Sequence, residues 1–272
     1  MQSAAVADDY SALRQATTPD VRAAIRAGAY QSHTSGLAFG KLQANLAILP
    51  ADAALDFMRF CQRNPKPCPL VGVTETGDPM MRTLGAIDIR TDVPAYNIYR
   101  DGKLTESISD ISDLWRDDLV AFALGCSFTF ERALTEAGIE VDHITHNLTV
   151  PMYRTTIETR SAGPFGRGMV VSMRLLPKDR VEDAVEISRS YPWAHGAPVH
   201  IGAPEEIGIA DLNKPEWGDP PAVLDERVPV FWACGVTPQN AVLSAKLSFC
   251  ITHKPGHMII TDVDEMAETP FV

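Results

Sequence analysis

Two continuous apolar runs near the C-terminal end of the sequence limit the fold more than any other feature. Residues 228–233 and 247–251 are short and apolar, and each run leads into a loop rich in glycine and proline. Uninterrupted apolar runs of this length are typical of strands buried on both faces, as in a parallel sheet covered by helices. Thr237-Pro238, in the first loop, then predicts the start of a helix. We therefore expect an α/β fold with a parallel or mixed sheet covered by helices.

The same two loops predict a ligand site at the carboxyl edge of that sheet. A strand, a glycine turn and a helix start leave free backbone N–H groups there, and open α/β sheets bind ligands at this edge. The residues that the two loops bring to the edge are Gly235, Thr237, Gln239, His253, Lys254 and His257. Helix-end N–H groups together with a lysine and two histidines predict a site for a small acid.

The composition excludes several other classes of protein. The formal net charge is -11 and no stretch is rich in Lys or Arg, which argues against nucleic-acid binding. The longest uncharged run, residues 228–245, contains Pro229 and Pro238 and is not a membrane span. The first residues show no signal peptide, and the 5 cysteines form no C-x-x-C pair. We expect a cytoplasmic protein with reduced thiols that binds a small carboxylate and is compatible with a homo-oligomer.

Local patterns predict the order of helices and strands. The predicted elements are helices at 18–28 and 50–64, a strand at 70–73, strands at 96–100 and 103–107 around Asp101-Gly102, a helix at 110–138, strands at 152–158 and 169–176, a helix at 179–190 and a strand at 199–201. Residues 33–45, with glycines and short polar side chains, predict a loop. We see no internal repeat.

This order predicts two domains. Residues 1–112 and 213–272 would form a discontinuous α/β domain, and residues 113–212 would form a smaller inserted α+β domain. The segment 213–225, rich in proline, glycine and charge, would link the insert back to the main sheet.

Gly125-Cys126-Ser127 reads as a break between two helices. Ser127 would cap the second helix and leave Cys126 at its positive end, where the pKa of a thiol falls. Glu131 follows Ser127 by about one helical turn and could share its face. The alternative is a capped helix with a buried structural cysteine.

The spacing of His253 and His257 does not predict a metal site. Pro255-Gly256 between them forbids the helix that would place both imidazoles on one metal, and no third ligand has a telling spacing. Acid–base chemistry is the functional reading of these histidines, and capping of backbone groups in a turn is the structural one. No cofactor signature is present, and we predict no cofactor. Arg154, on a predicted strand, is a candidate clamp for a carboxylate or one half of a structural salt bridge.

Beyond these local patterns, the sequence resembles the D-glutamate cyclase-like family, whose members are also described as hydro-lyases. The resemblance runs nearly end to end. The segments that carry it are Thr34-Ser-Gly-Leu37, Gln43-Ala-Asn45, Asn64-Pro-Lys-Pro-Cys-Pro69, Gly125-Cys-Ser-Phe128 with Glu131, Val150-Pro-Met-Tyr-Arg-Thr155, Phe231-Trp-Ala-Cys-Gly-Val-Thr-Pro-Gln239 and Ile251-Thr-His253 with Pro255-Gly-His-Met258 and Thr261-Asp262. Phe39 stands where members usually carry proline, and Lys41 where they often carry an aromatic residue.

The resemblance implies a lyase that removes water from a small amino or hydroxy acid, with the conversion of D-glutamate to 5-oxo-D-proline as the prototype. Under this reading, His253 or His257 moves a proton together with Glu131, and Cys126 and Ser127 are nucleophiles or donors. The substrate would be held by Arg154, Lys254, Ser35, Gln43, Asn45 and the turn that contains Gly235, Thr237 and Gln239. Two alternatives remain: an amide or ester hydrolase that uses Cys126, and a non-catalytic small-carboxylate sensor or partner subunit.

Overall fold

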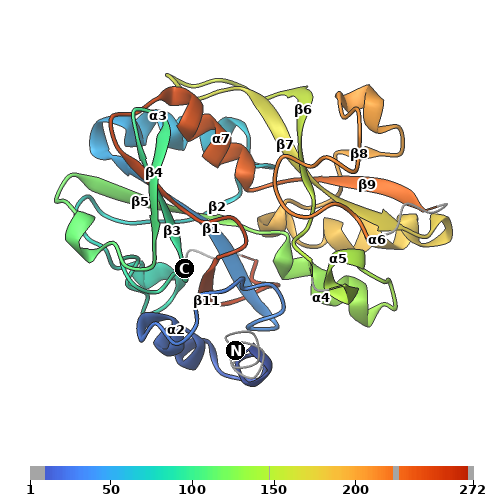
Figure 1. Cartoon of the computed structure of the whole chain (residues 1–272), viewed down its shortest axis with the longest axis horizontal. Helices are drawn as coiled ribbons and strands as arrows, with labels where there is room; N and C mark the ends of the chain where they lie inside the picture. Colours follow the sequence, from blue (N-terminus) through green and yellow to red (C-terminus); the bar gives the residue numbers. More distant parts are fainter. Residues whose placement is uncertain (1–9, 147, 223–226, 269–272) are drawn as a thin grey trace.

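The computed structural model, which describes residues 10–146, 148–222 and 227–268, contains two antiparallel sheets side by side (Figure 1). The larger sheet has seven strands in the order β2-β5-β1-β10-β3-β4, with β11 also paired to β1; the smaller has the order β6-β7-β9-β8. The strands of the larger sheet are β1 (Lys41–Pro50), β2 (Leu70–Val73), β3 (Tyr96–Arg100), β4 (Lys103–Ile108), β5 (Leu119–Gly125), β10 (Cys250–His253) and β11 (Ile259–Asp264). Those of the smaller sheet are β6 (Met152–Glu158), β7 (Gly168–Leu176), β8 (His200–Ile201) and β9 (Val228–Ala233).

The expected α/β fold, with a parallel or mixed sheet covered by helices, is wrong. Every described strand pair is antiparallel, and the fold consists mainly of two antiparallel sheets with few helices. The run 228–233 does form a strand, β9, whereas only the end of the run 247–251 lies in a strand, since β10 begins at Cys250. Both faces of the larger sheet carry a hydrophobic core: Leu46 and Ile48 of β1 lie in one, and Ala47 and Leu49 lie in the other. An antiparallel strand covered on both faces needs the same unbroken apolar sequence as a parallel one, so the pattern cannot distinguish the two.

Six described α-helices surround the sheets, and several of them match the sequence-based expectation. They are α2 (Thr18–Arg26), α3 (Ala51–Arg63), α4 (Phe128–Glu136), α5 (Asp142–Thr145), α6 (Val181–Arg189) and α7 (Val236–Ala245). The helix predicted at 110–138 is wrong, since its middle forms the fully buried strand β5 and only its end forms α4. The loop predicted at 33–45 is also wrong in part, because β1 begins at Lys41.

The two sheets do not follow the predicted domain division. β5 belongs to the larger sheet although it lies within residues 113–212, and β9 belongs to the smaller sheet although it lies within residues 213–272. The division into separate domains stays a prediction.

An internal repeat, which we did not expect, relates the β5–α4 unit to the β9–α7 unit. The segment Cys126–Leu134 reads C-S-F-T-F-E-R-A-L, and the segment Cys234–Val242 reads C-G-V-T-P-Q-N-A-V. The backbone N–H of Cys126 donates to the carbonyl of Gln43 on β1, and that of Cys234 donates to the carbonyl of Val170 on β7, both at 3.0 Å.

The threonines of the repeat make equivalent bonds as well. The hydroxyl of Thr129 accepts the N–H of Gln43 at 3.3 Å, and that of Thr237 accepts the N–H of Val170 at 3.0 Å. These matched bonds make β1 with β5 equivalent to β7 with β9. The repeat escapes a search for identical letters because only a few of its residues are the same.

The two units exchange their helices and following strands between the sheets. α4 follows a strand of the larger sheet, yet its Phe130 and Leu134 pack with Trp232 of the smaller sheet. α7 follows a strand of the smaller sheet, yet its Val242 packs with Leu49 of the larger sheet. In the same way β6, after α4, pairs with β7, and β11, after α7, pairs with β1. The two sheets are therefore locked together through both helices.

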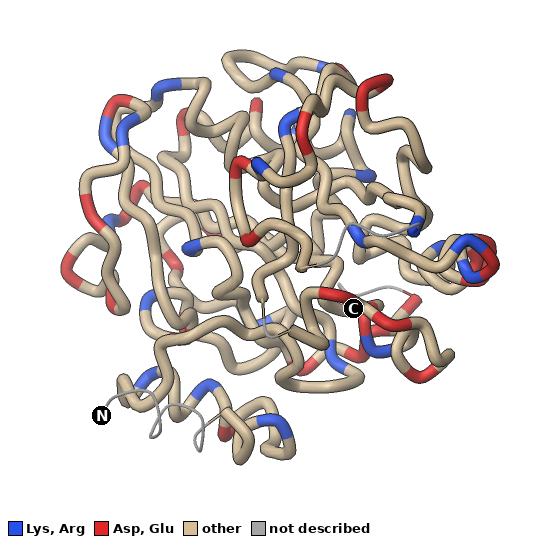
Figure 2. The backbone as a smooth tube through the Cα atoms, turned by 45° about the vertical axis from the view of Figure 1, so that its right-hand side comes forward, with Lys and Arg blue, Asp and Glu red and all other residues tan. Residues whose placement is uncertain are grey.

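Charged residues of both signs are interspersed along the outer segments (Figure 2). Within the described ranges, no helix is both long and apolar enough to cross a membrane.

Candidate functional site

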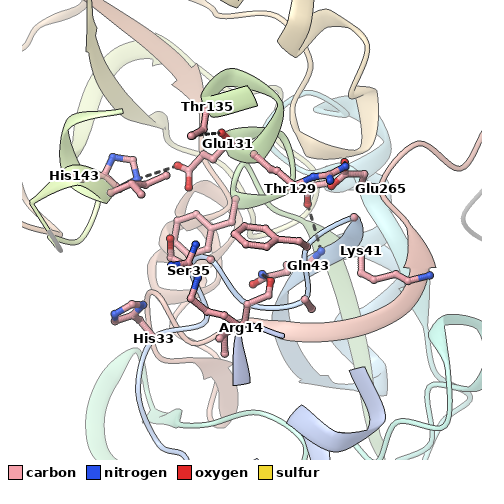
Figure 3. Close-up of a pocket in the computed structure, with 18 of the residues that line it drawn as sticks. Arg14, His33, Ser35, Lys41, Gln43, Thr129, Glu131, Thr135, His143 and Glu265 are labelled. Atoms are coloured by element: carbon pink, nitrogen blue, oxygen red, sulfur yellow. Dashed lines mark hydrogen bonds and ion pairs between the residues drawn. The ribbon is translucent and has the colours of Figure 1, made fainter. Parts of the chain in front are cut away.

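A cavity of about 500 Å³ lies beside α4, and residues of the segment 33–41 and of α5 also line it (Figure 3). Its lining residues include Tyr10, Arg14, His33, Ser35, Phe39, Lys41, Gln43, Thr129, Glu131, Arg132, Thr135, His143 and Glu265. We call it the α4 cavity. It brings together Ser35, Gln43 and Glu131 from the predicted site, and also both positions that depart from the family pattern, Phe39 and Lys41.

Hydrogen bonds fix the loop that forms one wall of the α4 cavity. The N–H of Thr34 donates to the carbonyl of Gly256 at 2.9 Å, and its hydroxyl accepts the N–H of Met258 at 3.0 Å. The Tyr10 hydroxyl donates to the carbonyl of Ser35 at 2.7 Å. Gly36 has a φ of +76°, and a Cβ there would lie 2.6 Å from that hydroxyl. Only glycine therefore permits this turn and its contact with Tyr10.

Glu131 is a buried carboxylate at the cavity wall. Its Oε1 lies 2.5 Å from Nη2 of Arg174 and 3.0 Å from Nε2 of His143, and its side chain is 3% exposed. Its Oε2 has no hydrogen bond to the described residues, and the carboxylate points toward the loop that carries Ser35 (Figure 3). Burial acts to raise the pKa of Glu131, but the neighbouring His143 and Arg174 side chains hold that pKa below its ordinary value. Glu131 is therefore an ionised carboxylate with one oxygen free.

Arg174, on the four-stranded sheet, binds the Glu131 carboxylate. It is fully buried on β7, where it donates to Ser127 at 3.1 Å and to Ser172 at 3.0 Å. Its guanidinium also lies 5.2 Å from the ring centroids of both Phe130 and Trp232. Such an arginine, enclosed by hydroxyls and aromatic faces, supplies a fixed positive charge rather than a mobile one.

Arg14 is the cation of the α4 cavity that is left without an ion pair among the described residues. Lys41 pairs with Asp264 at 2.5 Å, and Arg132 pairs with Glu265 at 2.9 Å. The Arg14 guanidinium instead lies over the ring of Phe39, 5.2 Å from its centroid. This group and the backbone N–H of Ser35, which bonds no described acceptor, could bind a substrate carboxylate.

Gln43 is held by the loop that contains Thr34 and Leu37, which forms one wall of the α4 cavity. Its side-chain nitrogen donates to the carbonyls of Thr34 at 3.1 Å and Leu37 at 2.9 Å, while its Oε1 is buried with no partner in the described structure. His33 Nδ1 is likewise buried and unpartnered there, and burial lowers the pKa of this imidazole. Both unpaired atoms belong to residues that line the α4 cavity, where a polar ligand could satisfy them.

A second group of predicted residues surrounds a small inner space of about 20 Å³, too small for a substrate. Its lining includes Asn45, Cys126, Ser127, Gly235 and His253. Both strand-to-helix junctions of the internal repeat meet here. Ser127 occupies the N-cap position of α4, but its side chain makes no capping bond. Burial raises the pKa of the Cys126 thiol to about 12, opposite to the expected thiolate.

Neither predicted histidine lines the α4 cavity. His253 ends β10 and is fully buried, where its Nδ1 accepts the N–H of Leu46 at 3.0 Å and lies 2.9 Å from the side-chain nitrogen of Gln239. Burial lowers the pKa of His253 to about 4. His257 Nδ1 lies 3.0 Å from the carbonyl of Pro255, and burial lowers its pKa as well.

The remaining predicted residues lie elsewhere. Gln239 and Lys254 line a different cavity, beside α7. Thr237 is buried and bonded to the backbone of Val170. Arg154 is exposed, with its guanidinium 5.1 Å from the ring of Trp217. The predicted residues are therefore divided among the α4 cavity, the inner space and the cavity beside α7, with Arg154, Thr237 and His257 outside all three, and the roles assigned to them stay predictions.

Three residues of the α4 cavity region were missed. Arg174 had a detectable signal, because a charged residue interrupts the apolar run of β7. His143 follows Asp142 in a four-residue helix and Arg14 precedes the first predicted helix, and neither position has a usable spacing. Within the described ranges, no cluster of three or more His, Cys, Asp and Glu residues could hold a metal ion.

An ionised buried carboxylate beside a histidine, in a cavity that Arg14 also lines, could bind a small anionic ligand and exchange protons with it. Comparison with known proteins places the chain more narrowly. Residues 120–262 match the model of the D-glutamate cyclase family. The chain is 65% identical to a "Putative hydro-lyase" of Dinoroseobacter shibae over 97% of this chain and 88% of that protein. It is 63% identical to one from Ruegeria pomeroyi over 97% of this chain and 96% of that protein.

The chain belongs to the D-glutamate cyclase family, as the resemblance implied, and the expected enzyme class agrees with the names of these relatives. A solved nitrogen repressor-like protein from Methanococcus jannaschii gives a TM-score of 0.37 at 10% identity over 86% of this chain and 91% of that one. That similarity is too low to support an argument.

Proposed function

We propose that the protein is a hydro-lyase that acts in the α4 cavity on a small amino or hydroxy acid, with the conversion of D-glutamate to 5-oxo-D-proline as the prototype. The observation that carries the proposal is the Glu131 carboxylate, which is kept ionised by Arg174, lies 3.0 Å from His143 and has one oxygen free. Family membership supports the class of reaction, and the geometry around Glu131 supports the α4 cavity as its site.

The reaction needs both a proton acceptor and a proton donor. In the prototype, the amine nitrogen bonds to the side-chain carboxyl carbon, a C–O bond breaks, and two protons move from nitrogen to the departing oxygen, which leaves as water. We assign the transfer to His143, whose Nδ1 bonds no described residue. Glu131 would hold the other ring nitrogen and stabilise the imidazolium that forms. The free Oε2 of Glu131 would also attract the substrate's ammonium group.

The cavity offers separate groups for the carboxylates. Arg14, with no ion pair among the described residues, would bind the α-carboxylate, and the N–H groups of the Ser35 turn would stabilise the charge that develops on the attacked carboxyl. Phe39 and Lys41, the two positions that depart from the family pattern, both line this cavity. Phe39 and Lys41 are therefore the candidates for residues that give this protein a substrate preference different from that of other family members.

The hydrolase alternative has little support, because the Cys126 thiol is buried and its pKa is raised to about 12, so that little thiolate forms at neutral pH. A catalytic cysteine needs the opposite environment.

The direct test is to incubate the protein with D-glutamate and L-glutamate and follow 5-oxoproline by chiral chromatography. We expect product from one enantiomer, and we expect Glu131→Gln to lower kcat by about 100-fold or more. Glu182→Gln, an exposed glutamate on α6, is the matched control and should keep the full rate. Undiminished turnover in a folded Glu131→Gln protein would refute the assignment of Glu131.

Arg14→Met tests the carboxylate clamp separately. It should raise KM by about tenfold while kcat changes less, because the contact is made in both the ground state and the transition state. A change confined to kcat would mean that Arg14 acts on the reacting atoms instead.

A further inference from the structure

The internal repeat produces a second cavity, of about 490 Å³, beside α7. We call it the α7 cavity. Four equivalent positions of α4 and α7, the last of them one residue beyond the repeat segments, line the two cavities: Phe128, Glu131, Arg132 and Thr135 in the α4 cavity, and Val236, Gln239, Asn240 and Leu243 in the α7 cavity. The same face of the repeated helix therefore lines a cavity in both units.

The two cavities differ at the position that carries the proposed chemistry. Gln239 stands where the first unit has Glu131, and an amide cannot accept or donate a proton near neutrality. Its nitrogen is held by His253, 2.9 Å from Nδ1 and 3.2 Å from the backbone carbonyl. The α7 cavity therefore keeps the shape of the repeat without the acid–base group.

Two opposite charges line the α7 cavity without pairing. Lys254 has no ion pair among the described residues, and Asp219 accepts the N–H of Thr149 at 2.7 Å but meets no described cation. Asn97, Ser107 and Asn240 also line the cavity. A cation and an anion that face one cavity without neutralising each other suit a ligand that carries both charges.

We propose that the α7 cavity is a second, non-catalytic binding site for a small amino-acid zwitterion, with the carboxylate on Lys254 and the ammonium on Asp219. The charges of the cavity specify a zwitterion, while the choice of D-glutamate as the probe rests on the proposed function. In this arrangement one chain converts the amino acid in the α4 cavity and binds a second molecule in the α7 cavity.

Trp217 provides a direct readout because it lines the α7 cavity and not the α4 cavity. Wild-type protein and Trp217→Phe are titrated with D-glutamate, and the difference between their fluorescence changes reports on this cavity. We expect a saturable difference signal. Lys254→Met and Asp219→Asn should each weaken binding and so raise the half-saturation concentration by about tenfold or more. Lys178→Met, an exposed lysine on the far 3₁₀ turn before α6, is the matched control and should leave it unchanged.

Glutarate, which has both carboxylates of glutamate but no ammonium, tests the zwitterion itself. It should bind the α7 cavity at least about tenfold more weakly than D-glutamate. Equal binding of glutarate, no saturable signal, or a signal indifferent to Lys254→Met would each overturn the proposal. The titration is repeated in Glu131→Gln, so that binding in the α7 cavity is measured separately from turnover. A Trp217 signal without turnover in the wild type would refute only the proposed function. Turnover without the Trp217 signal would refute only the second site.

Discussion

Nη2 of Arg174 lies 2.5 Å from Oε1 of Glu131, with the two side chains 0% and 3% exposed. The pair joins β7 of the smaller sheet to α4, the helix that crosses from the larger one. Two charges removed from water are stable only while both are present, since removal of one leaves the other buried and uncompensated. This pair therefore links the stability of the sheet interface to the ionisation of the proposed catalytic carboxylate.

Arg174→Met should lower the free energy of unfolding by about 3 to 5 kcal/mol, because Glu131 would lose its buried counter-ion. Urea unfolding at neutral pH measures this loss. The double variant Arg174→Met, Glu131→Gln should recover much of the stability, since it removes both charges. A double variant less stable than the single one would show that packing of the arginine, not its charge, matters here.

Gly235→Ala should destabilise the protein by about 1 to 3 kcal/mol. The φ of Gly235 is -64°, so alanine causes no backbone strain, but its Cβ would lie 2.0 Å from the side-chain nitrogen of Asn45. In an Asn45→Ala background, where the three atoms nearest to that Cβ are gone, the same substitution should cost much less. A thermal-unfolding cycle over the four proteins measures the difference, and equal costs in both backgrounds would exclude the contact as the cause.

The protein should lose stability as the pH falls from 6.5 toward 4. Burial lowers the pKa of His195 and of His253 to about 4, while an unfolded histidine titrates near 6.5. Between these values the unfolded chain binds protons that the folded chain excludes, so the free energy of unfolding falls on acidification. At pH 5 the loss amounts to about 2 kcal/mol for each histidine.

Urea unfolding at pH 7.5 and pH 5.0 tests this prediction. His195→Asn, which suits the left-handed backbone at φ +77° and can still donate to the carbonyl of Lys66, should show a smaller loss than the wild type. An identical pH dependence in this variant would mean that His195 is not the group that excludes the proton.

Iodoacetamide should leave all 5 cysteines unlabelled in the native protein at pH 8, because each is buried. Burial raises the thiol pKa of Cys234 to about 11 and that of Cys250 to about 12, so little thiolate is present to react. Mass spectrometry against a urea-unfolded sample measures the extent of labelling. Selective labelling of Cys126 with loss of activity would revive the hydrolase alternative.

Only part of the candidate site was predictable from the sequence. Glu131, Ser35 and Gln43, which the family segments placed in one site, line the same cavity, and their roles stay predictions. His253 was expected in the same place because it follows an apolar run, but β10 extends through it and turns its ring into the interior. Arg14 lies in a turn and His143 in the short helix α5, and no local pattern in the sequence specifies that either residue reaches the α4 cavity.

The sequence by itself determined most of the individual strands and helices, because periodicity, capping residues and the Asp101-Gly102 turn act over a few neighbours. It also determined the family. Strand direction, the exchange of α4 and α7 between the sheets, and the contact of Arg174 with Glu131 were decided only by the tertiary structure. These depend on pairings between residues far apart in the chain: Ala47 opposite Thr252, or an arginine 43 positions from its carboxylate. Burial also shifted the pKa values of the predicted groups. The exclusion of water that surrounds Glu131 and Arg174 also raises the pKa of Cys126 and lowers that of His253.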